Sequence, residues 1–186
     1  MSRISFYHNT NLTLEIMDYD YFLERFQKAA DQLDKKMLIQ KHLEIYVGVT
    51  LNSVVLKLYK KAWSNDKADP INAKTRIFFA IWVNDQTLKH NKVFYNIHAL
   101  KLRQLKGYSI ASREFADSFR SDLKKHEKHW ENVSVKLGPL TLMEGWNYFE
   151  NENLENTIIK LANNFLEIEY IIDHTLEKFK SRKVIH

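Results

Sequence analysis

The segment 76–83 reads Arg-Ile-Phe-Phe-Ala-Ile-Trp-Val and is followed by the turn-forming pair Asn84-Asp85. Short apolar runs that are rich in β-branched and aromatic residues and bounded by turn residues are typical of strands. Because this segment is apolar on both faces, we predict a central strand that is covered on both sides, with Trp82 in the core. A single strand cannot be stable alone, so the chain must contain a sheet.

Other segments supply strand partners. Residues 43–51 and 54–59 alternate in part around the turn-forming pair Asn52-Ser53, which predicts a hairpin. A helix over 43–60 is the alternative, since a short apolar run has no unique period. Residues 133–137 and 140–149, separated near Gly138-Pro139, are two further strand candidates, and the short stretches 3–7 and 12–16 are two more. The polar segment 64–75 is the clearest loop.

Apolar residues at helical spacing predict helices over 19–41, over 87–106, from Ser109 or Ser112 to about 130, and over 152–181. Asp18 or Asp20 is a candidate N-cap for the first helix. The last helix has the most regular pattern, with apolar residues every three or four positions over most of its length. Its apolar stripe consists of Leu154, Ile158, Leu161, Phe165, Ile168, Ile172, Leu176 and Phe179.

Together these segments predict an α+β fold. We expect a mostly antiparallel sheet of three to five strands packed against four or five helices, with helix in the majority. The 186 residues contain no linker or internal repeat, so we expect one globular domain over 1–186.

Composition excludes several classes of protein. The chain has no cysteine, which excludes disulfide scaffolds, thiolate metal sites and cysteine nucleophiles. No glycine-rich phosphate-binding motif is present. We therefore expect no cofactor and no metal. The sequence contains neither a signal-peptide pattern nor an apolar stretch long enough for a membrane span, so we expect a soluble, cytoplasmic protein without a membrane partner.

Positive charge is concentrated in one part of the chain. Residues 89–129 contain ten Lys and Arg but four Asp and Glu, whereas the whole chain has a net charge of +5. A clustered basic face attracts polyanions, so we expect a non-enzymatic module that binds nucleic acid or another polyanion. Interleaved Tyr95, Tyr108 and Trp130 could stack on bases; a solvated helical face is the alternative. The candidate binding residues are Lys101, Arg103, Lys106, Arg113, Arg120 and Lys124.

A second hypothesis is a structural or assembly protein. The apolar stripe of the 152–181 helix is nearly heptad from Leu154 to Ile172, a pattern typical of helices that pair with a second copy of the chain. The same stripe is equally typical of an amphipathic helix that packs on its own sheet. A homodimer through this helix is therefore an alternative function.

A third hypothesis is a hydrolase or nuclease-like enzyme with a site near His98, Arg120 and His126. Arg120 precedes His126 by six residues, which resembles the Arg-x(4–6)-His motif of HEPN ribonucleases. The resemblance implies that Arg120 binds a phosphate and that His126 is a general acid or base. It also implies an all-helical fold, from which the strand predicted at 76–83 departs.

The predicted order of helix, three strands, helix and strand resembles the core of PD-(D/E)xK nucleases. That resemblance implies a divalent metal held by carboxylates on the central strands. Segments 54–61 and 76–83 contain no Asp or Glu, so the chain departs from the family at the metal site. His126 and His129 are three apart on a predicted helix, but the sequence offers no specific third ligand for a metal.

Overall fold

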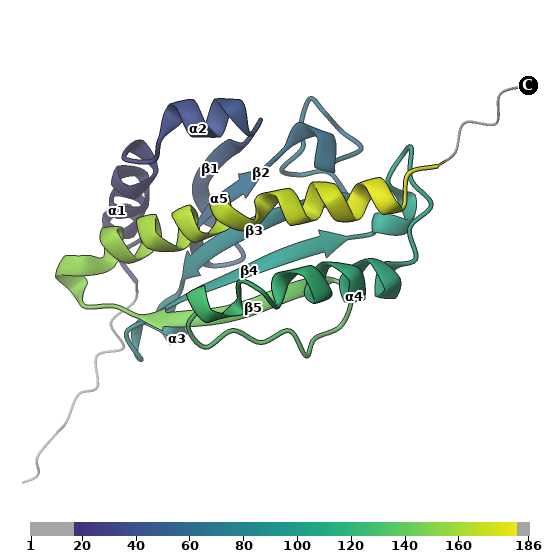
Figure 1. Cartoon of the computed structure of the whole chain (residues 1–186). Coiled ribbons are helices and arrows are strands. Elements are labelled where there is room, and N and C mark those ends of the chain that lie inside the picture. The colour runs from purple at the N-terminus through teal and green to yellow at the C-terminus, as the bar shows by residue number, and fades with distance from the viewer. Residues whose placement is uncertain (1–16, 182–186) are drawn as a thin grey trace, which may run out of the picture.

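A computed structural model describes residues 17–181, so the short strands predicted at 3–7 and 12–16 lie outside the described residues. The fold is α+β, as predicted, and contains more helix than strand (Figure 1). The helices are α1 (Tyr19–Asp31), α2 (Lys35–Gln40), α3 (Asp85–Leu88), α4 (Ser112–Leu123) and α5 (Leu154–Lys178). The strands are β1 (Glu44–Thr50), β2 (Ser53–Tyr59), β3 (Arg76–Val83), β4 (Lys92–Leu100) and β5 (Thr141–Tyr148).

The five strands form one antiparallel sheet in the order β1-β2-β3-β4-β5, so each strand pairs with its neighbours in the chain. The hairpin predicted over 43–60 is confirmed as β1 and β2, but its turn lies one residue earlier than the expected Asn52-Ser53. Its two turn residues, Leu51 and Asn52, have φ of 50° and 57°, as in the tight turns that match the twist of a hairpin. β3 is the central strand of the sheet, as its apolar sequence predicted.

The helix predicted over 87–106 is wrong, because most of this segment forms strand β4. Val93 and Ile97 are four apart and fit a helical stripe, but Val93, Tyr95, Ile97 and Ala99 are all buried and alternate with less buried residues. This alternation is the period of a strand. Only the first residues of the predicted helix are helical, since they belong to the four-residue helix α3. Its N-cap Asn84 forms a capping box with Thr87.

Three other boundaries differ from expectation. The predicted 19–41 helix is divided into α1 and α2, since Asp34 caps a new helix by accepting from the backbone N–H groups of Lys36 and Met37. Segment 133–137 is not a strand and has a single bridge, between Ser134 and Glu144. The helix predicted from Ser109 or Ser112 to about 130 begins at Ser112, ends at Leu123 and is followed by a short 3-10 turn.

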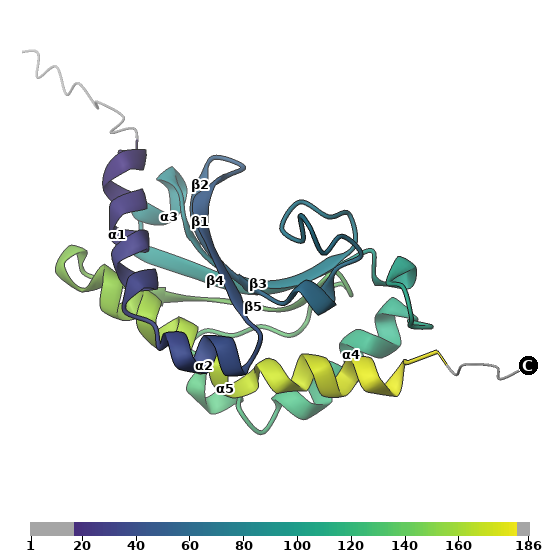
Figure 2. The same ribbon diagram turned by 90° about the horizontal axis from the view of Figure 1, so that it is seen from above.

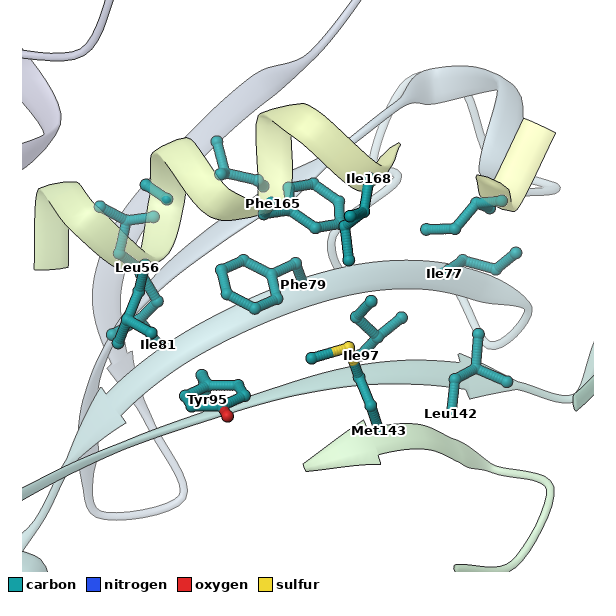
Figure 3. Close-up of a cluster of buried hydrophobic side chains, with 14 of the residues drawn as sticks. Leu56, Ile77, Phe79, Ile81, Tyr95, Ile97, Leu142, Met143, Phe165 and Ile168 are labelled. Atoms are coloured by element: carbon teal, nitrogen blue, oxygen red, sulfur yellow. The ribbon is translucent and has the colours of Figure 1, made fainter. Parts of the chain in front are cut away.

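The helices α1, α4 and α5 cover one face of the sheet, α1 over β1 and β2, α5 over the centre and α4 over β5 (Figures 1 and 2). Phe165 of α5 stacks on Phe79 of β3 with ring centroids 4.6 Å apart, in the middle of the core shown in Figure 3. Arg25 of α1 donates from Nε to Glu155 of α5 at 2.7 Å and ties these two helices together.

The sheet is therefore covered on one side by helices. The prediction that β3 is covered on both sides holds only in part for residues 17–181. None of the helices described there packs on its other face, although Phe78 and Ala80 on that face are buried. Trp82 is correspondingly half-buried rather than part of the core. This second face carries the candidate site.

Candidate ligand-binding face of the sheet

Side chains of β2 to β5 that point away from the helices form a surface that we name the open face. Successive side chains of a strand point to opposite faces, so every second residue belongs to it. The register of the sheet aligns these residues in rows across neighbouring strands. The open face consists of Val55, Lys57, Arg76, Phe78, Ala80, Trp82, Lys92, Phe94, Asn96, His98, Leu100, Thr141, Glu144, Trp146 and Tyr148.

The open face contains a concave cavity of about 450 Å³, which we name the cup. The sheet curves, and the β1–β2 hairpin rises on one side of it while the segment between β2 and β3 rises on the other (Figure 2). Leu51 at the hairpin tip is 92% exposed and borders the cup. Polar side chains of the open face also line it, namely Lys57, Arg76, Asn96 and His98.

Lys57 is the most unusual of these residues, since its side chain is buried at 6% exposure. Its Nζ donates to Thr50 Oγ1 at 3.3 Å and lies 5.4 Å and 5.2 Å from the ring centroids of Tyr46 and Phe78. No carboxylate among residues 17–181 forms an ion pair with it. Burial, and secondarily the charge of Arg76, lowers the pKa of Lys57 to about 8.

Two more polar groups of the cup lack partners within residues 17–181. The Nε of Arg76 and the Oδ1 of Asn96 are buried and form no hydrogen bond there, although Arg76 also donates from Nη1 to the carbonyl of Ala73. Burial lowers the pKa of Arg76 and that of His98, which favours the neutral imidazole. A buried polar group without a partner is costly, so the cup is suited to a polar ligand.

Gly48 on β1 leaves room for the Tyr46 ring beside Lys57. A Cβ at this position would overlap the phenol ring of Tyr46, which lies across the glycine on the same face. The glycine therefore lets Tyr46 lie flat beside the Lys57 ammonium, where the ring face favours a cation.

Next to the cup, an aromatic row crosses three strands. The register pairs Trp82 with Phe94 and Phe94 with Trp146, and the rings of Trp82 and Phe94 stack with centroids 5.0 Å apart. The Nζ of Lys92 lies 3.5 Å from the ring centroid of Trp146 and is close to Tyr148, which is 65% exposed. Half-exposed rings beside a cation can stack on planar groups.

The predicted basic residues occupy a different part of the molecule. Lys101, Arg103 and Lys106 are exposed and follow the end of β4, whereas Arg113 and Lys124 are exposed near the two ends of α4, on the helical side. The structure does not gather these five residues on the open face.

Arg120 is turned inward. Its guanidinium donates to the carbonyl groups of Leu137, Gly138, Thr141 and Leu142 at 2.9 to 3.1 Å. Its Nε and Nη2 thus connect α4 to residues 137–138 and to the start of β5, and its Nη1 lies 3.8 Å from Asp117.

The residues of the proposed enzyme site are not brought together. His98 lies on the open face, where its Nδ1 is 3.3 Å from Thr141 Oγ1. His126 follows α4 and its Nε2 is 3.2 Å from the Tyr170 hydroxyl of α5, in the helical layer. Among the residues that the structure describes, no group of three His, Asp or Glu could hold a metal ion.

The apolar stripe of α5 is buried against the rest of the protein. Leu154, Ile158, Leu161, Phe165 and Ile168 are each 0–1% exposed. Packing on its own sheet thus accounts for the pattern that also suggested a dimer. No helix within 17–181 is long and apolar enough to cross a membrane.

Comparisons with protein-family models, with curated proteins and with solved structures found no match to this chain.

None of the three aromatic residues predicted to stack on bases lies on the open face. Tyr108 is packed against the core and forms a β-bridge with Lys180. Tyr95 and Trp130 are buried in the core, with the Tyr95 hydroxyl donating to the Glu131 carbonyl at 2.6 Å. Phe94 and Trp146 are half-buried on the open face instead. The alternation of apolar and polar residues within 92–100 could have indicated this arrangement. A strand there places Phe94 and Tyr95 on opposite faces of the sheet.

Proposed function

We propose that this protein binds single-stranded nucleic acid on the open face of its sheet. The observation that carries the proposal is the aromatic row of Trp82, Phe94 and Trp146 with Lys92 against it, on a sheet whose opposite face is covered by helices. Proteins that bind single strands combine aromatic side chains, on which bases stack, with cations that follow the phosphates.

The dimensions of the open face favour an extended ligand. From Lys92 to Leu100, strand β4 spans about 26 Å at roughly 3.3 Å per residue. A ligand of several nucleotides would use this length, whereas a small molecule would occupy the cup alone. The exposed Lys101, Arg103 and Lys106 follow the end of β4 and supply further positive charge near the path of such a strand.

The ligand is still nucleic acid, as expected from the sequence, but the binding surface is the open face and not the basic face expected over 89–129. Residues 92–100 belong to the basic segment 89–129, and they contribute one strand of the open face. Arg113 and Lys124, which lie on α4, would not contact a ligand bound there.

The test is a fluorescence-anisotropy titration with a labelled 12-nucleotide single strand, as DNA and as RNA, at two salt concentrations. We expect binding that weakens with salt, because phosphate contacts release counterions. Trp146→Ala should weaken binding about five- to one-hundredfold, since stacking on one aromatic ring contributes roughly 1–3 kcal/mol per base.

The matched control is the double variant Arg113→Ala, Lys124→Ala, which removes two positive charges from the helical side. It should reduce affinity less than twofold. A large loss in this variant combined with no loss in Trp146→Ala would contradict the proposal, as would the absence of binding at low salt. Circular dichroism and a thermal melt establish that each variant is folded.

A further inference from the structure

The cup contains a buried cation without an anion. Lys57 is 6% exposed and has one hydrogen bond, to a hydroxyl group, and Arg76 has an unpaired buried Nε in the same cavity. Buried lysines in proteins are normally paired with a carboxylate or lose their charge. Two basic side chains that face one cavity provide the charge that an oxyanion requires.

We propose that the cup binds a phosphate monoester at the end of a nucleic-acid strand that lies on the aromatic row. The inference rests on the proposed function, because the row would hold the adjoining bases. A terminal monoester carries about 1.5 to 2 negative charges at neutral pH and three acceptor oxygens, whereas an internal phosphodiester carries one charge. The Lys57 ammonium and the Arg76 guanidinium would donate to these oxygens.

The shape of the cup also favours a strand end. Leu51 at the hairpin tip and Trp82 both line it, and Trp82 pairs with Phe94 in the register of the sheet. A ligand in the cup can therefore continue along the sheet toward Phe94. An internal phosphate would need space for the chain in two directions. The buried Oδ1 of Asn96 would accept from a hydroxyl group of the terminal sugar.

Charged and titratable groups near Lys57 come from all the strands packed around it. They are the Tyr46 phenol on β1, Arg76 on β3, His98 on β4 and Glu144 on β5, and Asp69 between β2 and β3 acts on Arg76. Neither Glu144 nor Asp69 forms an ion pair with Lys57. The Lys57 ammonium therefore has no carboxylate partner among residues 17–181.

The experiment compares oligonucleotides of one sequence that carry a 5′-phosphate, a 3′-phosphate or hydroxyl groups at both ends. We expect one of the two phosphates to tighten binding at least tenfold at pH 7. Lys57→Met should abolish this gain, whereas Lys124→Met, a matched change on the helical side, should preserve it. The Lys57→Arg variant should retain the gain, because arginine supplies the same charge.

The pH dependence separates a buried amine from other cations. The gain should fall about five- to tenfold between pH 7 and pH 9, as Lys57, whose pKa is about 8, loses its proton. The phosphate, with its second pKa near 6, and His98, whose pKa is lowered, do not change charge over this range. In Lys57→Arg the gain should be independent of pH.

The outcomes distinguish the two proposals. If all three oligonucleotides bind equally and Trp146→Ala weakens each, the phosphate site is overturned and the proposed function stands. If no oligonucleotide binds but adenosine 5′-monophosphate does, with the same dependence on Lys57, the cup takes free phosphate monoesters, so the strand-end assignment and the proposed function are both overturned. If neither binds, both proposals fail.

Discussion

Two buried lysines, Lys57 and Lys60, lie three positions apart at the end of β2, yet their surroundings are opposite. The Nζ of Lys60 contacts Glu169 Oε2 at 2.5 Å and Asp173 Oδ2 at 2.6 Å, and Asp173 also accepts from the indole N–H of Trp63 at 2.6 Å. Lys57 has aromatic rings and one hydroxyl group as neighbours. The buried charge of Lys60 is thus neutralised by carboxylates of α5, whereas that of Lys57 on the open face has no carboxylate partner.

Because their surroundings differ, Lys60 and Lys57 have different roles. Lys60, Glu169 and Asp173 connect the end of β2 to α5 and stabilise the fold through paired charges. Lys57 makes no such connection, so its charge is available to a ligand. The comparison predicts effects on stability of opposite sign when each lysine is replaced.

The largest effect is expected for Lys60→Met. This variant leaves the buried Glu169 with Lys41 as its remaining cation partner, at 2.9 Å, and removes the cation partner of Asp173. Breaking a buried ion pair destabilises a protein by about 3–5 kcal/mol. Urea denaturation followed by circular dichroism measures the free energy of unfolding. Lys61→Met is the control, because its exposed pair with Glu44 contributes at most about 1 kcal/mol. Equal losses in the two variants would remove the distinction between buried and exposed lysines.

A smaller effect of opposite sign is expected for Lys57→Met. Methionine fills a similar volume between the Tyr46 and Phe78 rings without a charge to desolvate, so the free energy of unfolding at pH 7 should rise by about 1 kcal/mol. A loss of stability in the same urea assay would mean that the Lys57 charge contributes to the fold.

A third expected effect is a pH dependence of that gain. The pKa of Lys57 is lower in the folded protein, at about 8, than in the unfolded chain, near 10.5. The unfolded state binds more protons between these values, so the stability of the wild-type protein rises with pH relative to Lys57→Met. The advantage of the variant should shrink between pH 8 and pH 10. A constant difference over this range would show that Lys57 titrates normally.

Much of the fold follows from local patterns. Three elements were predicted correctly, namely the strand at 76–83, the hairpin over 43–60 and the long C-terminal helix. In each of them the spacing of apolar residues matches the secondary structure that forms. Segment 92–100 was misassigned, since Val93 and Ile97 satisfy both a helical and a strand period. Its pairing with β3, a contact between distant residues, decides between them.

The candidate site was harder to predict. Lys57 interrupts the apolar run from Val54 to Leu58, but the sequence does not show which face of the hairpin the helices cover. The apolar sequence of β3 also suggested two covered faces, because the open face carries Phe78 and Trp82 in place of surface residues. Aromatic side chains on an uncovered face resemble a core in any pattern that counts hydrophobicity alone.

The order of the strands has a consequence for synthesis on the ribosome. Each strand pairs with the one made just before it, so the sheet can assemble stepwise as a growing chain emerges. The helix that covers its centre, α5, follows all five strands. Until α5 emerges, Phe79 and its neighbours are left without the stacked ring of Phe165. The nascent sheet therefore passes through an interval with apolar surface exposed, when chaperones that bind such surface would be of use.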